Sequence, residues 1–161
     1  QDLDIPIYFI TGNHEHYLRD YEQKMRSLKK SKITFLDNRN VTYKELNIIG
    51  LTDRNSDLNK IESAKKMVDE SLYNVCLVHQ PSIWDELCTD IDIMLSGHTH
   101  NGQIFPFNLL VKIKFKYIYG LYKRENNLLY VSSGSGTWGP KMRLGSFNEI
   151  ISLKLSNEGK L

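Results

Sequence analysis

The sequence predicts an α/β protein in which parallel strands carry polar loops to one edge of a sheet. Short apolar, β-branched segments alternate with segments of helical periodicity. Three of the apolar segments, residues 6–10, 73–78 and 91–95, are followed closely by loops that contain histidine. Because the carboxyl ends of parallel strands lie along one edge, where open α/β sheets bind ligands, these loops are expected to form a common site.

Residues 6–10 form the first expected strand, which ends before Thr11 and Gly12. A polar loop with the sequence Asn-His-Glu-His follows at positions 13–16, and helical periodicity begins at Tyr17. The apolar stripe of this helix consists of Tyr17, Tyr21, Met25 and Leu28. We interpret Glu15 and His16 as residues of the helix start.

The middle of the chain predicts short strands at residues 33–36, 41–43 and 47–51, the last two joined as a hairpin. A helix is expected over residues 58–68, capped by Ser56 or Asp57. Its inward side chains are expected to be Leu58, Ile61, Ala64 and Met67 or Val68. Asp53 lies between a strand and a helix, which favours its interpretation as a solvated loop residue. The alternative is that it places a carboxylate at the edge of the site.

The last third of the chain contains an unusual alternation over residues 109–119, where Lys112, Lys114 and Lys116 alternate with apolar side chains. Alternation of this kind favours an exposed strand, although the apolar content also permits a helix. Residues 128–131 predict a further strand, followed by a loop rich in glycine and serine. Residues 149–155 predict a final strand.

The composition indicates one domain over residues 1–161, because a chain of 161 residues that is 40% hydrophobic can bury a single core. A formal net charge of +2 gives no general attraction to nucleic acid or membranes, and no nucleic-acid-binding signature is present. Two cysteines make no disulfide framework, which favours a reducing compartment such as the cytoplasm. No apolar segment is long enough to span a bilayer.

Histidines at the expected strand ends indicate a metal site. Asn13 and His14 follow the first strand, His79 the second, and His98 and His100 the third. Imidazole nitrogens with an amide oxygen suit Mn, Fe, Zn, Co or Ni better than Mg or Ca. For the His-x-His pair taken alone, the alternative is a polar loop with incidental histidines. No aspartate stands at these three strand ends to offset the charge of two neighbouring dications.

Three motifs of this sequence resemble those of the calcineurin-like metallophosphoesterases, in the same order. They are Gly12-Asn13-His14-Glu15, Val78-His79-Gln80 and Gly97-His98-Thr99-His100. The loop through Gln103 further resembles a branch of small bacterial enzymes that share a Gly-His-Thr-His-x-Gly-Gln sequence. The resemblance implies two packed mixed β-sheets flanked by helices, and it implies that the chain is the carboxyl-terminal two-thirds of such a domain.

The resemblance also implies roles for individual residues. Asn13, His79 and His98 would bind one metal, His100 would bind its neighbour, and His14 would contact the phosphate and protonate the leaving oxygen. The first two motifs of the family, which supply the bridging carboxylate, would lie before residue 1. Two divalent transition metals are therefore expected only in the complete enzyme.

The implied function is hydrolysis of a phosphomonoester or phosphodiester by a metal-bound hydroxide, with this chain alone inactive. A non-catalytic metal-binding or scaffold module and a zinc hydrolase of another kind are the alternatives. The expected partner is a small phosphorylated substrate, and the lysines of residues 109–123 allow peripheral association with an anionic membrane. The expected location is the cytoplasm, or the cytoplasmic face of a membrane if an anchor precedes the chain.

Overall fold

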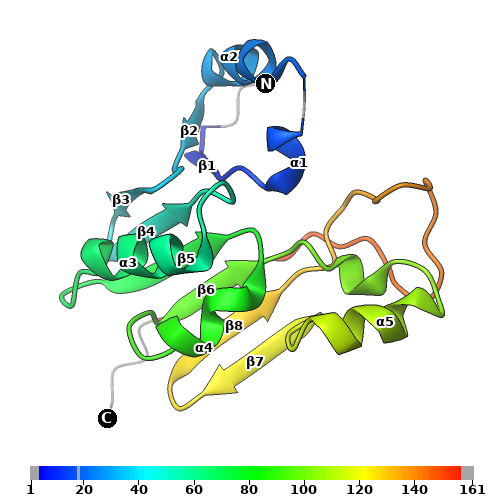
Figure 1. Ribbon diagram of the computed structural model, residues 1–161. Coiled ribbons are helices and arrows are strands. Elements are labelled where there is room, and N and C mark those ends of the chain that lie inside the picture. The colour runs from blue at the N-terminus through cyan, green and yellow to red at the C-terminus, as the bar shows by residue number, and fades with distance from the viewer. Residues whose placement is uncertain (1–3, 18, 157–161) are drawn as a thin grey trace.

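The computed structural model describes residues 4–17 and 19–156, and within them most strands lie in one mixed sheet (Figure 1). Its strand order is β3-β4-β5-β6-β8-β7. The strands are β3 (Arg39–Tyr43), β4 (Leu46–Leu51), β5 (Tyr73–Val78), β6 (Ile93–Ser96), β7 (Gly120–Arg124) and β8 (Asn127–Val131). The neighbours β4, β5, β6 and β8 are parallel, and antiparallel hairpins add β3 and β7 at the two edges.

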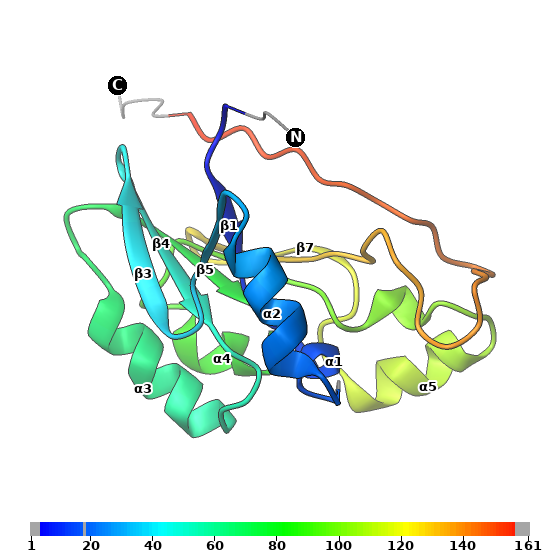
Figure 2. The same cartoon turned by 90° about the horizontal axis from the view of Figure 1, so that it is seen from above.

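A second, smaller sheet consists of the parallel strands β1 (Ile7–Phe9) and β2 (Ile33–Phe35). Helix α2 (Tyr21–Lys29) connects these two strands and packs on β2 through the buried Met25. Helices α3 (Asp57–Met67) and α4 (Trp84–Leu87) cover the opposite side of the large sheet (Figure 2). The prediction of two sheets flanked by helices is therefore confirmed.

The main core lies between the large sheet and helices α3 and α4. Trp84 and Leu87 of α4 pack there against apolar side chains from all four parallel strands, and each is at most 1% exposed. Burying a large apolar side chain contributes about 1.5–3 kcal/mol, so this layer fixes the parallel strands in place. Ser56 caps α3 by accepting a hydrogen bond from the Asn59 amide at 3.4 Å, as predicted.

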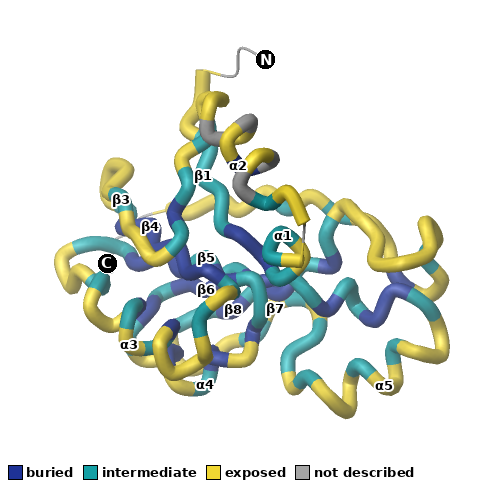
Figure 3. The backbone as a smooth tube through the Cα atoms, turned by 45° about the horizontal axis from the view of Figure 1, so that its top comes forward, coloured by how far each residue is buried: buried dark blue, intermediate teal, exposed yellow. Residues whose placement is uncertain are grey.

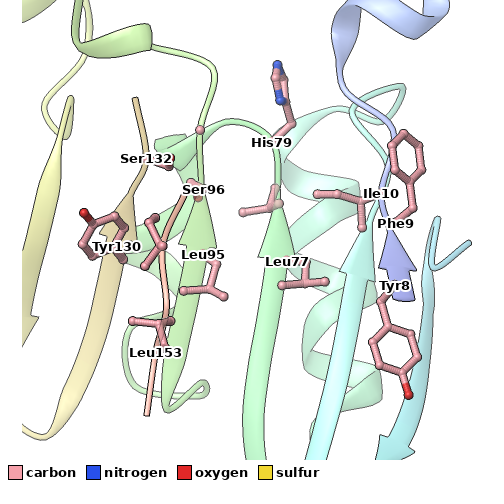
Figure 4. A pocket seen from close by; sticks show the side chains of 13 residues that line it. Tyr8, Phe9, Ile10, Leu77, His79, Leu95, Ser96, Tyr130, Ser132 and Leu153 are labelled. Carbon is pink, nitrogen blue, oxygen red and sulfur yellow. The ribbon is translucent and has the colours of Figure 1, made fainter. Parts of the chain in front are cut away.

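The other face of the large sheet is only partly covered. Apolar side chains of β5 and β6, including Leu77 and Leu95, border a cavity of about 470 Å³ (Figure 4). The small sheet closes one side of this cavity with Tyr8, and the carboxyl-terminal segment closes the other with Leu153. The central strands are thus apolar on both faces, as parallel strands usually are.

The segment from 109 to 119 differs from the predicted exposed strand. Residues Phe107–Lys114 form helix α5, which is followed by a short connection to β7. Pro106 stands at the start of the helix, where backbone amides have no carbonyl partner within the helix. Its missing amide hydrogen therefore costs no hydrogen bond. The alternation of lysine and apolar residues was therefore a wrong indicator of strand structure.

Two smaller predictions are also wrong. Residues 149–155 form no strand, because the structure pairs them with no neighbouring strand among the described residues. Leu58 is 74% exposed and does not face the core, unlike Ile61 and Ala64 of the same helix. The helix predicted from Tyr17 begins at Tyr21, after the single turn α1 (Asn13–His16).

Candidate functional site

The ends of β1, β5 and β6 lead to three polar side chains that lie in contact. Asn13 is the first residue of α1, His79 directly follows β5, and His98 is the second residue after β6. The Asn13 Oδ1 atom lies 2.8 Å from His79 Nε2, and His98 Nδ1 lies 3.0 Å from the same nitrogen. Figure 4 shows His79 projecting beyond the end of its strand. Three segments distant in sequence thus place one amide oxygen and two imidazole nitrogens together.

Gly12 is required for this contact because the backbone passes close to the His79 ring. A Cβ atom at Gly12 would lie 2.9 Å from Cε1 and Nδ1 of His79, which is closer than side chains normally approach. The backbone amide of Gly12 donates a hydrogen bond of 2.7 Å to the Glu15 carboxylate. Glu15 therefore fixes the start of α1, in agreement with its interpretation as a residue of the helix start.

The loop after β6 has an unusual backbone. His98, His100, Asn101 and Gln103 all have φ between 50° and 67°, in the left-handed region that non-glycine residues rarely adopt. This loop is therefore not extended between the two histidines, and their side chains have different partners. His98 contacts His79, whereas His100 Nδ1 lies 3.4 Å from a guanidinium nitrogen of Arg143.

Gln103 and Arg143 hold this strained loop. The Gln103 side chain, which is buried, donates to the Trp138 carbonyl at 2.6 Å and accepts from the Trp138 amide. Arg143 donates to the carbonyls of His100 and Ser133 at 3.1 and 2.7 Å. These hydrogen bonds hold the loop in its strained backbone conformation. Strained conformations at functional sites persist only when surrounding contacts fix them in this way. No role was predicted from the sequence for the Arg143 side chain.

Burial keeps the clustered imidazoles neutral. It lowers the pKa of His98 to about 4, with a further contribution from His79, and it lowers the pKa of His79 although the Asp53 carboxylate opposes the shift. Burial and the Arg143 guanidinium both lower the pKa of His100. A neutral imidazole is the form that binds a metal ion, so the site is preset for coordination.

Asp53 is buried, and the favoured prediction of a solvated loop residue is wrong. Its side chain is only 1% exposed, although a solvated loop residue was favoured. One carboxylate oxygen lies 3.1 Å from Lys60 Nζ, and both oxygens accept hydrogen bonds from the Gln80 amide at 3.1 and 2.9 Å. Gln80 directly follows His79, so this buried ion pair anchors the end of β5 just behind the histidine cluster.

His14 lies at the open side of the cluster. Its side chain is exposed and its ring lies 6.1 Å from the ring of Tyr17. A positive charge on His14 would lower the pKa of His79, His98 and His100, which places it near all three. The His16 ring instead packs against the Tyr21 ring in a tilted arrangement, with the ring centroids 5.3 Å apart.

The donor atoms suit part of a metal site. Two imidazoles and an amide oxygen within hydrogen-bond distance of one another can turn their lone pairs to a single ion. Within the described residues, no group of three or more His, Cys, Asp or Glu side chains could by itself hold a metal. The cluster therefore offers neutral ligands and no carboxylate.

Comparison with known proteins gives a consistent set of matches. The family described as calcineurin-like phosphoesterase matches residues 1–102. An uncharacterised metallophosphoesterase of Helicobacter pylori is 38% identical over 156 residues, covering 92% of this chain and 42% of the relative. A bovine protein named as a transmembrane protein with a metallophosphoesterase domain is 34% identical over 172 residues, covering 92% and 38%.

A third relative, an uncharacterised metallophosphoesterase of Bacillus subtilis, is 29% identical over 157 residues, covering 89% of this chain and 58% of the relative. The chain spans about two fifths of the length of the Helicobacter and bovine relatives. The bovine protein shows that the similarity is not confined to bacteria. No solved structure matches the chain at a significant level.

Proposed function

Because this chain belongs to the calcineurin-like phosphoesterase family, we propose that it carries the histidine cluster of a metal-dependent phosphomonoesterase or phosphodiesterase. The contact between Asn13, His79 and His98 is the observation that supports this most directly. Metal-dependent phosphoester hydrolysis is general in the family, and the cluster offers the nitrogen and oxygen donors that such chemistry needs.

We assign Asn13, His79 and His98 to one divalent transition metal, and His100 to a neighbouring one. Mn, Fe, Zn, Co or Ni would suit these donors. When bound, such ions polarise a phosphoryl oxygen and lower the pKa of a coordinated water. His100 can join them only by exchanging its contact with Arg143, because the guanidinium lies 3.4 Å from its Nδ1 atom. Neutral ligands alone compensate little metal charge, so this chain by itself is expected to bind at most one ion, weakly and without turnover.

His14 is proposed as the group that contacts the phosphate and donates a proton to the leaving oxygen. Its exposure supports this role, because a general acid has to reach a substrate that comes from solvent. Its position beside the three other histidines keeps that proton next to the cluster. An imidazole that is both exposed and next to the cluster favours the enzyme over the scaffold alternative.

The test compares two esters in the natural protein loaded with Mn. His14→Ala should lower turnover of an alkyl phosphoester by about 10²- to 10⁴-fold, and less for a p-nitrophenyl ester, which leaves without protonation. Tyr43→Ala is the control, since this exposed ring lies on β3 at the edge of the large sheet and has no assigned role. Equal losses on both esters would mean that His14 binds phosphate without donating a proton.

A metal-binding measurement separates the enzyme from a non-catalytic module. His79→Ala should abolish Mn or Zn binding in calorimetry, because both other donors contact this imidazole. Metal binding without hydrolysis of any phosphoester in the natural protein would favour the scaffold alternative. Two tight sites on this chain alone would contradict the assignment of its ligands.

We also propose that the protein works in the cytoplasm or at the cytoplasmic face of a membrane. Both cysteines are free and buried, which fits a reducing compartment. The bovine relative is named as a transmembrane protein, which supports a location near a membrane. Among the described residues, no helix has the length and apolar character needed to cross a bilayer.

A further inference from the structure

Helix α5 turns most of its large apolar side chains toward solvent, unlike an ordinary surface helix. Ile113 is 83% exposed, and Leu109 and Leu110 are 52% and 60% exposed. The side that is turned toward the protein instead carries Asn108 and Val111, which are half-buried. Surface helices normally bury their apolar stripe, so this inverted arrangement indicates that the outer face is covered by something else.

Lysines lie on both sides of the outward apolar stripe. At 100° per residue, Leu109, Leu110 and Ile113 span one face, with Lys112 on one side and Lys114 on the other. Both lysines are exposed. We call this face, with Phe107 at its start, the α5 surface; it comprises Phe107, Leu109, Leu110, Lys112, Ile113 and Lys114. A helix with this pattern can bury its apolar face in lipid while the lysines reach the headgroups.

Apolar side chains of neighbouring loops extend the α5 surface. Phe105 is 56% exposed, and its backbone amide bonds to the carbonyl of Leu144, which is 54% exposed. Trp138 is 61% exposed and is held beside the start of this segment by Gln103. Figures 2 and 3 show α5 as a largely exposed helix at one end of the molecule, far from α3.

The charge of the segment indicates an anionic partner. Residues 104–124 contain four lysines and one arginine and no acidic residue. Lys116 and Arg124 are paired with Asp85 at 2.8 and 2.9 Å, which ties the end of the segment to α4. Lys112 and Lys114 have no salt bridge within the described residues. Their charge is thus available to a surface that lies against the helix.

We propose that the α5 surface docks on the anionic face of a lipid bilayer, with the helix axis in the membrane plane. The apolar stripe enters the headgroup boundary, and the flanking lysines contact anionic lipid. A lipid surface fits better than a protein groove, because cations border the stripe on both sides and the stripe itself is convex. The inference is independent of the proposed hydrolysis, since binding is measured without turnover.

The test is co-sedimentation with vesicles of phosphatidylcholine alone and with about 30% phosphatidylglycerol added. We expect binding to the anionic vesicles only, decreasing when salt is raised from about 0.1 to 0.5 M. Lys112→Gln combined with Lys114→Gln should weaken this binding roughly 25-fold, about five-fold for each cation lost. Leu110→Ser combined with Ile113→Ser should weaken it more than about ten-fold at either salt concentration.

Two controls match these variants in charge and polarity. Lys44→Gln combined with Lys66→Gln removes two exposed lysines elsewhere, and Leu58→Ser removes an exposed leucine from α3. Neither should change binding. Because all substituted side chains are exposed, equal melting temperatures will confirm that the variants fold.

Tryptophan fluorescence gives a second measurement. The sequence contains two tryptophans, of which Trp84 is buried and Trp138 is exposed. Anionic vesicles should therefore shift the emission to shorter wavelength through Trp138. The proposal is overturned if the wild-type protein does not bind anionic vesicles, or if the α5 variants bind them equally well. It is also overturned if the serine variants only convert a dimer to a monomer in sedimentation, because the covering surface is then a second copy of the chain.

Discussion

Replacing Lys60 by methionine is expected to destabilise the protein strongly. Lys60 Nζ lies 3.1 Å from Asp53 and 3.1 Å from Asp57, and its side chain is 3% exposed. The Asp53 side chain is 1% exposed, so among the described residues Lys60→Met leaves this buried carboxylate with the Gln80 amide as its remaining side-chain donor of a short hydrogen bond. Removing one member of a buried ion pair costs about 3–5 kcal/mol. We expect the lower end of that range, because the hydrogen bonds from Gln80 are retained.

Thermal and urea unfolding measure this effect. In a domain of this size, about 1 kcal/mol shifts the melting temperature by about 2–4 °C, so Lys60→Met should lower it by about 6–12 °C. Adding Asp53→Asn to Lys60→Met should recover most of the loss, because no buried charge then remains. Lys65→Met is the control, since this lysine of the same helix is 49% exposed and pairs with Asp90 at the surface. It should cost less than about 1 kcal/mol.

A small loss of stability in Lys60→Met would contradict the stabilising role of the buried ion pair. A free energy of unfolding within about 1 kcal/mol of wild type for Lys60→Met would mean that Asp53 gains access to water or becomes neutral at little cost. A double variant that is no more stable than Lys60→Met alone would mean that the uncompensated Asp53 carboxylate is not the cause of the lost stability.

Two further predictions concern the histidine cluster. Gly12→Ala should push the His79 ring away from Asn13 and weaken Zn binding by more than about ten-fold in calorimetry, with little change in circular dichroism; unchanged affinity would contradict the close approach. In the metal-free protein, burial lowers the pKa of His79, His98 and His100, that of His98 to about 4. In the unfolded chain these imidazoles titrate near 6.5, so the unfolded state takes up protons first and the free energy of unfolding should fall as pH decreases from about 6.5 to 4. Urea titrations in the presence of a chelator at about pH 7.5 and pH 5 will show this, and equal stabilities would exclude it.

Sequence patterns predicted the parallel strands well because the side chains of these strands are apolar on both faces. A run such as Val75 to Val78 has few alternatives to a buried strand, and the polar residue after it marks the edge of the sheet. The contact of His79 with His98 follows from that topology, because β5 and β6 are parallel neighbours in the large sheet. The expectation that residues 6–10 share this sheet is wrong, since β1 pairs with β2 in the small sheet and brings Asn13 to the cluster from there.

The wrong predictions concern segments whose secondary structure or burial is decided by tertiary contacts. Residues 107–114 satisfy both a helical and an alternating pattern, and only their packing beside the histidine loop makes them helical. Residues 149–155 alternate like a strand, yet a strand needs a neighbour with which to pair. The burial of Asp53 depends on its ion pair with Lys60, seven positions later, which was not among the side chains of α3 expected to face inward.

The contact between Asn13 and His79 has a consequence for how the two sheets are joined. These residues are 66 positions apart, one after the small sheet and one after a central strand of the large sheet. An ion held by both residues would act as a cross-link that closes the loop of chain between them, as a disulfide does. For a loop of this length, the entropy removed from the unfolded chain amounts to about 4 kcal/mol. Metal loading would then fasten one layer of the protein to the other, and chelation would release them.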